Sequence, residues 1–155
     1  MRKTVVTMIA LFFVAAIAVT ISTVSNKANA EENNRVELFA GELDLDASIE
    51  AGKLVYEGKG TCAICHLATG MGLPPAFPPL AEADYLLADV QRAVKQTMYG
   101  SKTPITVNGT TYPGSVMTLT EMTDEEVRDV VNYILNSWGN DGGDVTLEDV
   151  EDERE

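Results

Sequence analysis

Two cysteines and a histidine stand close together in residues 61–66, whose sequence is TCAICH. Cys62 and Cys65 are three positions apart, and His66 directly follows the second cysteine. This C-x-x-C-H spacing is typical of the attachment site of c-type haem. One turn of helix brings both thiols to the same edge of a porphyrin, where they can form thioether bonds to its two vinyl groups. The adjacent imidazole can then bind the iron as its proximal ligand.

Three other uses of these residues fit the sequence less well. A structural zinc site needs four ligands of the cysteine or histidine type, whereas the chain contains two cysteines and one histidine. A thioredoxin-like redox pair is expected beside alternating strands and helices, and the sequence shows no such alternation. A disulfide between Cys62 and Cys65 would leave His66 without a role. We therefore interpret the motif as a covalent haem site.

An iron that carries electrons needs a sixth ligand, and methionine is the natural candidate because the chain has no second histidine. Met71 lies five residues after His66, which is too close to reach the opposite face of a haem easily. Met98 and Met122 occupy positions typical of helix packing. Met117 lies in an irregular stretch and is free to point at the iron. We predict that Met117 is the axial ligand and keep Met122 as the main alternative.

A proline-rich loop follows the motif. Residues 70–80 contain four prolines and two glycines, a composition that excludes regular secondary structure. Such a loop is stiff and apolar, and it can lie flat against a large ligand. Leu73, Phe77 and Leu80 would be exposed apolar side chains in an ordinary surface loop. The sequence therefore predicts that this loop forms a wall of the haem site.

The elements around this loop are predicted to be mainly helices. Ser48 is a candidate N-cap for a first helix, and Gly52 within that helix indicates a close crossing with another helix. Apolar residues at helical spacing predict a second helix over residues 84–98, ended by Gly100.

The C-terminal half contains a hairpin signal and the best-defined helix. Asn108 and Gly109 separate two short runs rich in Thr, Val, Ile and Tyr, which is typical of a tight β-hairpin. Thr123 and Glu126 form a capping-box pattern. Apolar residues then recur along one face as far as Trp138, which predicts a helix from residue 124 onward.

The first thirty residues are predicted to be a secretory signal peptide. Arg2 and Lys3 give a positive start, residues 5–24 are apolar, and residues 28–30 (ANA) supply a small-x-small cleavage site. Because the apolar run is long for a cleaved signal, an uncleaved membrane anchor is the alternative. Only in that case would a membrane be a partner. In either case we expect the domain to be exported, as a periplasmic protein.

The acidic residues are concentrated near the two ends of the chain. The formal net charge is −13, with seven acids and one arginine in residues 31–50 and eight acids and one arginine in residues 141–155. Such a balance excludes nucleic acid as a partner. We expect residues 31–47 to be an acidic leader and residues 140–155 an acidic, disordered tail, or else segments that steer the domain toward a basic partner. Residues 48–139 are then the folded domain.

With these residues placed, residues 48–139 resemble a class I c-type cytochrome. The likeness is greatest to the monohaem domains associated with copper nitrite reductases. It is carried by GKLVY at 52–56, CAICH at 62–66, the run at 70–86, ITVNGTTY at 105–112 and NSWGN at 136–140. The resemblance implies an all-α fold of three to four helices around one covalently bound haem c.

The resemblance also has implications for single residues. It implies that Met117 binds the iron, although the family usually has Met-Pro where this chain has Met117-Thr118. It implies that the carbonyl of Pro74 accepts the Nδ1 proton of His66, and that the first helix crosses the last near Tyr133.

The expected function is electron transfer rather than catalysis. Partners such as a terminal reductase or oxidase of respiration or denitrification would dock at an exposed haem edge near Cys62 and Cys65. A permanently bound haem subunit of a multi-subunit dehydrogenase or reductase is the alternative. A gas-binding or peroxidatic haem protein is a third hypothesis, and it requires an open sixth position in place of Met117.

Overall fold

The structure is a computed structural model that describes residues 44–114, 117 and 120–154. The predicted signal peptide and residues 31–43 of the predicted leader lie outside the described residues. Within the described ranges, no helix is both long and apolar enough to cross a membrane.

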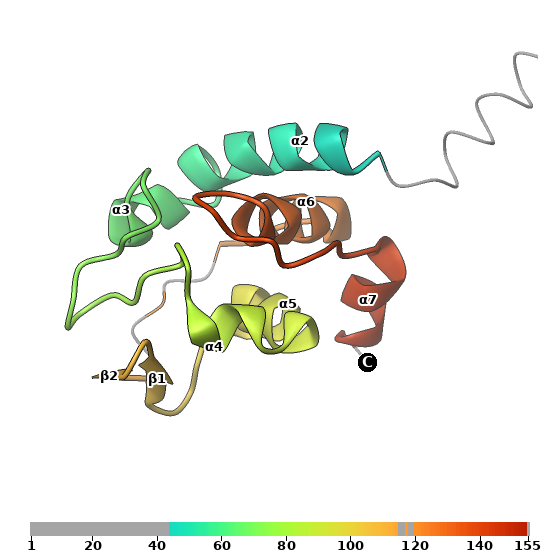
Figure 1. Ribbon diagram of the computed structural model, residues 1–155. Coiled ribbons are helices and arrows are strands. Elements are labelled where there is room, and N and C mark those ends of the chain that lie inside the picture. Colours follow the sequence, from blue (N-terminus) through green and yellow to red (C-terminus); the bar gives the residue numbers. More distant parts are fainter. Residues whose placement is uncertain (1–43, 115–116, 118–119, 155) are drawn as a thin grey trace, which may run out of the picture. The chain divides into compact units, whose positions relative to one another are not determined.

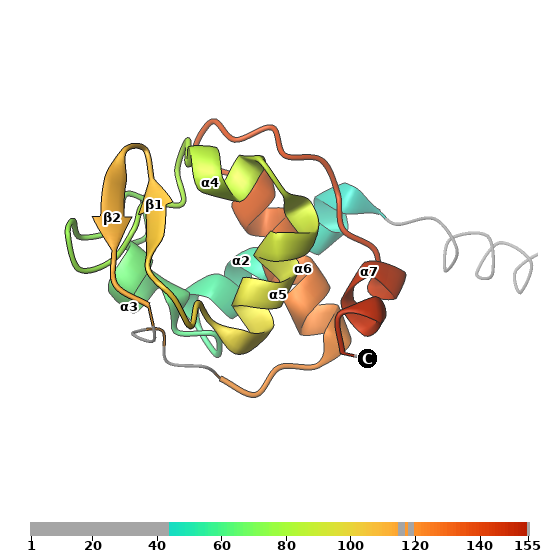
Figure 2. The same cartoon turned by 90° about the horizontal axis from the view of Figure 1, so that it is seen from below.

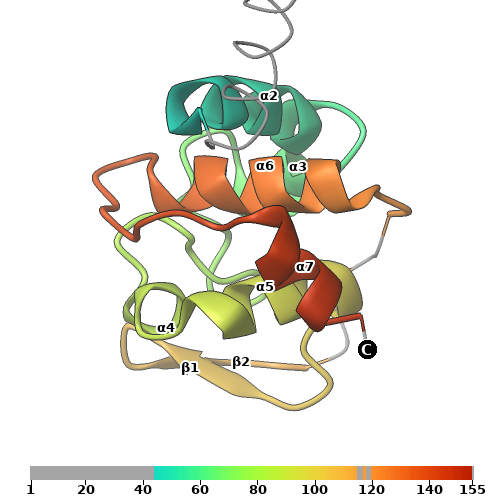
Figure 3. The same cartoon turned by 90° about the vertical axis from the view of Figure 1, so that its right-hand side faces the viewer.

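Six helices and one two-stranded sheet make up the described part of the chain, so the predicted all-α class is confirmed. Figures 1 and 3 show the helices in layers, with α2 over α6, α6 over α4 and α5, and the hairpin beyond α4. The elements in chain order are α2 (Leu45–Glu57), α3 (Cys62–His66), α4 (Asp84–Leu87), α5 (Val90–Tyr99), β1 (Ile105–Val107), β2 (Thr110–Tyr112), α6 (Asp124–Leu135) and α7 (Leu147–Asp152).

The two longest helices, α2 and α6, cross with their backbones almost in contact. A Cβ atom at Gly52 would lie 1.8 Å from the carbonyl oxygen of Asp129 and 2.9 Å from the Cβ of Tyr133. Only glycine fits at this point, because any side chain would overlap the backbone of α6. The crossing near Tyr133 that the family resemblance implied is therefore confirmed. The core beside it contains Tyr56 and the buried face of α6.

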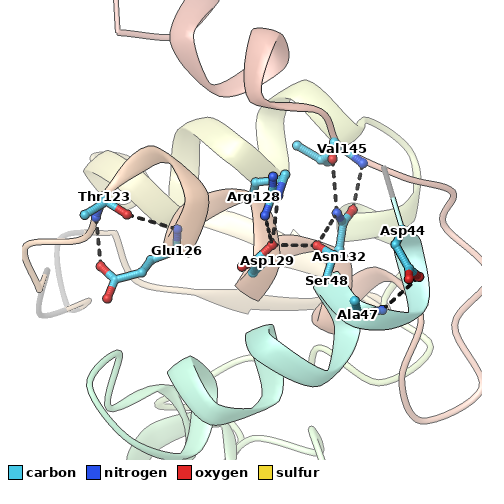
Figure 4. A network of polar contacts seen from close by, with 9 residues as sticks. All are labelled: Asp44, Ala47, Ser48, Thr123, Glu126, Arg128, Asp129, Asn132 and Val145. Atoms are coloured by element: carbon cyan, nitrogen blue, oxygen red, sulfur yellow. Dashed lines mark hydrogen bonds and ion pairs between the residues drawn. The ribbon is translucent and has the colours of Figure 1, made fainter. Parts of the chain in front are cut away.

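A buried polar network lies beside this crossing (Figure 4). The Ser48 hydroxyl donates to Oδ1 of Asp129 over 2.7 Å and accepts from the Asn132 amide over 2.9 Å. The same amide donates to the Val145 carbonyl, and the Val145 N–H donates back to Oδ1 of Asn132. The segment that follows α6 is therefore tied to both α2 and α6.

The prediction that Ser48 caps the first helix is wrong. The helix begins earlier, at Leu45, and the side chain of Asp44 accepts the N–H of Ala47 as the N-cap. Ser48 is buried in the second turn because its hydroxyl is needed by the polar groups of α6. Asp44, Asp46 and Ser48 are all residues of capping type, and only the tertiary contacts distinguish them.

The prediction of a disordered tail over residues 140–155 is also wrong. Residues 147–152 form α7, which packs against α5 and α6. Val145 and Val150 are fully buried in the main core, and Thr146 and Asp149 form a capping box. Val145 and Val150 thus hold the segment in the core, and Gln91 and Lys95 of α5 bind Asp149 and Glu153.

Apart from the C-terminal end of α6, which lies at Leu135 and does not include Trp138, the remaining elements agree with the sequence with one exception. The hairpin pairs Ile105 with Tyr112, and Asn108 and Gly109 both take positive φ, as a type I′ turn requires. The Thr123 capping box of α6 is present. The exception is the helix predicted over residues 84–98, which is divided into α4 and α5 because Asp89 caps the second part by accepting the N–H of Arg92.

Candidate functional site

The C-x-x-C-H motif folds as α3, a single helical turn. Thr61 before it and Leu67 after it have positive φ values of 56° and 63°, so the turn is separated from its neighbours. Cys62, Cys65 and His66 all line one cavity of about 350 Å³. The turn therefore presents both thiols and the imidazole to the same space, as covalent attachment of a haem requires.

The two thiols are free, since no disulfide joins Cys62 to Cys65. Burial raises the pKa of the Cys62 thiol, so this side chain stays protonated at neutral pH. Redox-active cysteine pairs instead rely on a lowered pKa. The described residues also contain no cluster of three or more metal-binding His, Cys, Asp or Glu side chains. The disulfide, redox-pair and zinc alternatives therefore find no support in this geometry.

His66 is held in the orientation and protonation state of a metal ligand. Its Nδ1 lies 2.9 Å from the carbonyl oxygen of Pro78, which can only accept, so Nδ1 carries the proton. Burial lowers the pKa of His66, and the hydrogen bond to Pro78 opposes that effect only in part. The ring is therefore neutral near pH 7, and the lone pair of Nε2 is available to a metal.

The prediction that Pro74 accepts this proton is wrong, and Pro78 takes its place. Leu73 and Phe77 form a bridge in which each N–H donates to the other's carbonyl, which puts Pro74 at the exposed tip of a small reversal. Pro78 follows the reversal and returns to His66. The approach depends on Gly72, at φ +63°, because a Cβ there would lie 2.4 Å from the Pro78 oxygen.

The proline-rich loop contributes part of the predicted wall. Phe77 and Leu80 line the cavity together with Pro78 and Pro79. Pro74 and Leu73 do not line it, and Leu73 is 46% exposed. The wall therefore begins at Phe77, after the reversal, and excludes the first part of the loop.

Met117 is the methionine that shares the cavity with His66. Among the described methionines, Met98 and Met122 pack against the main core and line a separate, smaller pocket, and Met71 is exposed. This arrangement favours Met117 over Met122 as the axial ligand. Binding of iron by Met117 stays a prediction.

The sequence analysis did not identify the wall supplied by α4 and α5. Tyr85, Arg92 and Gln96 line the cavity, and Arg92 is the only Asp, Glu, Lys or Arg side chain that does so within the described ranges. The guanidinium donates to the Tyr85 carbonyl and lies 3.9 Å from the centre of the Tyr85 ring. The available signal was the spacing of Arg92 and Gln96, which are four residues apart on one helix face.

Two aromatic side chains fix the segment that follows His66. The Tyr56 hydroxyl donates to the Leu67 carbonyl over 2.7 Å, and the Trp138 indole N–H donates to the Ala68 carbonyl over 3.0 Å. The rings of Tyr56, Tyr133 and Trp138 pack with their centroids 5.3 Å apart. The contact between α2 and α6 thus positions the His66 loop directly.

Asn140 performs a similar role for the other end of the proline-rich loop. Its amide donates to the Leu80 and Ile134 carbonyls, and its Oδ1 accepts the N–H of Glu82. The residue is buried. The cavity wall at Leu80 is therefore anchored to the C-terminal end of α6.

The cavity has the composition expected for a haem site. Its lining is predominantly apolar, with contributions from α3, the proline-rich loop, α4, α5 and the hairpin, whose arrangement is seen in Figure 2. The volume falls within the range of small-molecule and cofactor pockets. Two free thiols that could bind a porphyrin covalently open onto it, together with a neutral imidazole and a thioether that could bind its iron.

Comparisons with known proteins agree with this reading of the site. The family model described as cytochrome c matches residues 49–138. Cytochrome c-552 of Thermus thermophilus is 38% identical over 82 residues, which is 50% of this chain and 63% of that protein. The cytochrome c subunit of the quinone alcohol dehydrogenase of Gluconobacter oxydans (strain 621H) is 31% identical over 103 residues, or 65% of this chain and 21% of that protein. The chain thus spans less than two thirds of the length of either relative.

Proposed function

The chain belongs to the cytochrome c family, and we propose that it carries single electrons between redox proteins through one covalently bound haem c. The observation that carries this proposal is the shared cavity, onto which Cys62, Cys65, His66 and Met117 all open. Cys62 and Cys65 would hold the haem, and His66 and Met117 would occupy the two axial positions. A filled sixth position suits electron transfer, because no substrate needs access to the metal.

Each part of the site has a defined task in this function. When bound, the haem supplies an iron that alternates between two oxidation states. His66 is kept neutral and fixed in orientation by the Pro78 carbonyl, a contact that increases the basicity of the ring. The apolar lining excludes water, and a soft thioether ligand raises the reduction potential. No general acid or base is required, since no substrate bond is made or broken.

The partners and the compartment are part of the proposal. The signal-like residues 1–30 support export to the periplasm, and the resemblance to nitrite-reductase-associated domains supports a terminal reductase or oxidase as the electron acceptor. Thermus cytochrome c-552 is a relative that is named as a cytochrome alone, which supports a separate carrier.

A second candidate is a permanently bound haem subunit of a dehydrogenase. The observation that favours it is the relative named as the cytochrome c subunit of quinone alcohol dehydrogenase. A permanent interface is larger and more apolar than a transient one. Purification of the tagged chain from its own host at high salt separates the two candidates: a carrier elutes alone, whereas a subunit retains its partner.

The ligand assignment is tested with carbon monoxide. If Met117 fills the sixth position, the reduced protein should show no change in its Soret band when carbon monoxide is added. Met117→Ala should open the position, so that the band shifts and the weak far-red thioether–iron band of the oxidised protein disappears. Met122→Ala, the matched control, should leave both features unchanged. A wild-type protein that binds carbon monoxide readily would favour the gas-binding or peroxidatic alternative.

A further inference from the structure

Beyond the predicted signal peptide, the two longest stretches of this acidic chain without a charged side chain are residues 60–81 and residues 103–120. They lack Asp, Glu, Lys and Arg, although the whole chain has 24 acids and 11 bases. Both segments line the cavity, the first through α3 and the proline-rich loop and the second through the hairpin, Pro113 and Met117. The charge-free sequence therefore coincides with the surroundings of the proposed haem.

The same segments carry exposed apolar side chains. Ile64 is 73% exposed and also lines the cavity, so it lies at the cavity's opening. Met71 and Leu73 are 59% and 46% exposed, and Leu73 is bridged to Phe77 of the cavity wall. We call Ile64, Met71 and Leu73 the uncharged face. Met117 is left out of it because its thioether is assigned to the iron.

The acidic residues of α7 lie away from this face. Five of the six residues from Glu148 to Glu153 are acids, and they belong to α7 and its C-cap. Figures 1 and 2 both show α7 at the end of the domain opposite to α3. A basic protein would be attracted to this acidic end, where it has no access to the cavity.

We propose that the uncharged face docks a redox partner whose own cofactor is surrounded by an uncharged, apolar surface. The inference rests on the proposed electron-transfer function and adds the chemistry of the partner to it. Contact between two apolar surfaces is stabilised because apolar area is removed from water, so it needs no ion pairs. A small apolar patch also gives the weak, short-lived contact that repeated electron transfer needs. The rate of productive encounter should therefore be nearly independent of salt.

The experiment measures electron transfer from the reduced full-length haem protein to two protein probes by stopped-flow spectroscopy. One probe is a blue-copper protein whose copper lies beneath an uncharged apolar patch, and the other is a basic cytochrome with lysines around its haem edge. With the blue-copper probe, the rate should change less than about twofold between roughly 0.02 and 0.3 M salt, because no charge at the contact is screened.

Ile64→Lys and Leu54→Lys form a matched pair of variants. Both side chains are 73% exposed, but Leu54 lies on α2 and does not line the cavity. Ile64→Lys should slow transfer to the blue-copper probe by about tenfold, because a charge would have to be desolvated in the contact. Leu54→Lys should leave the rate unchanged. Met71→Lys replaces Ile64→Lys if the latter impairs haem attachment.

The outcomes separate the docking proposal from the function on which it rests. The docking proposal is overturned if the basic probe is the faster acceptor and its rate falls steeply with salt, or if both lysine variants slow transfer equally. Failure of the proposed function looks different: the wild-type protein, with an intact haem spectrum and normal reduction by dithionite, would pass electrons to neither probe.

Discussion

Arg92 places a positive charge in the wall of a cavity that is otherwise lined by uncharged residues in the described part of the chain. Its guanidinium is oriented by the Tyr85 carbonyl and ring. In the proposed holoprotein this charge can pair with a haem propionate, and it opposes the extra positive charge of oxidised iron. The arginine should therefore favour the reduced state.

Arg92→Gln should lower the reduction potential by roughly several tens of millivolts. The charge of Arg92 is partly buried, so it would act on the haem iron through a medium of lower dielectric constant than water. Arg92→Lys should restore part of the difference, since it keeps the charge but loses the planar contact with Tyr85. Potentiometric titration followed at the haem bands gives the measurement. Lys95→Gln is the matched control, because Lys95 is on the same helix with its side chain 63% exposed. An equal shift in both variants would mean that only overall charge matters.

At the scale of single residues, chemistry was easier to predict than geometry. Cys62, Cys65 and His66 are recognisable because covalent attachment requires that spacing, whereas the choice of Met117 over Met122 as the iron ligand stays a prediction. The acceptor of the His66 proton was assigned to Pro74 rather than Pro78. That choice depends on the reversal between Leu73 and Phe77, a backbone feature that residue types do not specify.

At the scale of elements, the α2–α6 crossing depends on Gly52, which has no side chain. Gly52→Ala would place a Cβ 1.8 Å from the Asp129 carbonyl oxygen, so the helices must separate. We expect a loss of about 1–3 kcal/mol in the free energy of unfolding, the usual cost of overpacking. Because Tyr56 and Trp138 hold the His66 loop from this contact, the far-red band should weaken as well. Urea unfolding, monitored by far-UV circular dichroism, gives the free energy of unfolding.

Lys53→Ala is the control for this change, since Lys53 is exposed on the same helix. It should leave stability within about 0.5 kcal/mol of wild type, as surface substitutions usually do. If Gly52→Ala behaves in the same way, the close approach of the two helices is not a constraint on the fold.

Helix α7 should make the stability of the protein depend on pH. Asp149 accepts hydrogen bonds from the hydroxyl and N–H of Thr146 and from the Gln91 side chain. The bond from the Thr146 hydroxyl is the main reason why the pKa of Asp149 lies below its ordinary value. The ionised form is thus favoured in the folded state. Its contribution is fully present above the ordinary pKa near 4 and is lost as the pH falls through the folded pKa.

Asp149→Asn should therefore destabilise the protein at pH 6 but make little difference at pH 2. We expect an effect of less than about 1 kcal/mol, at the lower end of capping contributions, because the site is partly solvated. Thermal unfolding at the two pH values gives the comparison. Asp152→Asn, at the last position of α7, is the control. A difference for Asp149→Asn that is equal at both pH values would show that its carboxylate is not the titrating group.

The elements were predicted well where a local pattern defines them and poorly where packing does. The Thr123 capping box and the Asn108-Gly109 turn are local signals, and both structures are present. The acidic C-terminal segment was interpreted by composition, which overlooks two valines that become fully buried. Ser48 was taken for a cap because its buried partners on α6 are 81 and 84 residues away.

At the scale of the whole molecule, the cavity is a gap in the hydrophobic core that the cofactor must fill. An enclosed apolar cavity costs about 24 cal/mol per Å³, so even a partly open one of about 350 Å³ should cost on the order of several kcal/mol. The net stability of a domain is only about 5–15 kcal/mol. Without haem the chain should therefore lose most of the free energy that holds its tertiary structure.

The double variant Cys62→Ala/Cys65→Ala, purified free of haem, should accordingly keep much of its far-UV circular dichroism but lose the near-UV signals of its tyrosines and Trp138. Local helix signals such as the Thr123 capping box survive loss of the cofactor, whereas fixed packing of aromatic rings does not. Unfolding should become broad and weakly cooperative, in contrast to the sharp transition of the haem protein. A colourless polypeptide with an intact near-UV spectrum and a cooperative transition would show that the fold is complete without a porphyrin, and the assignment of the cavity would then fail with it.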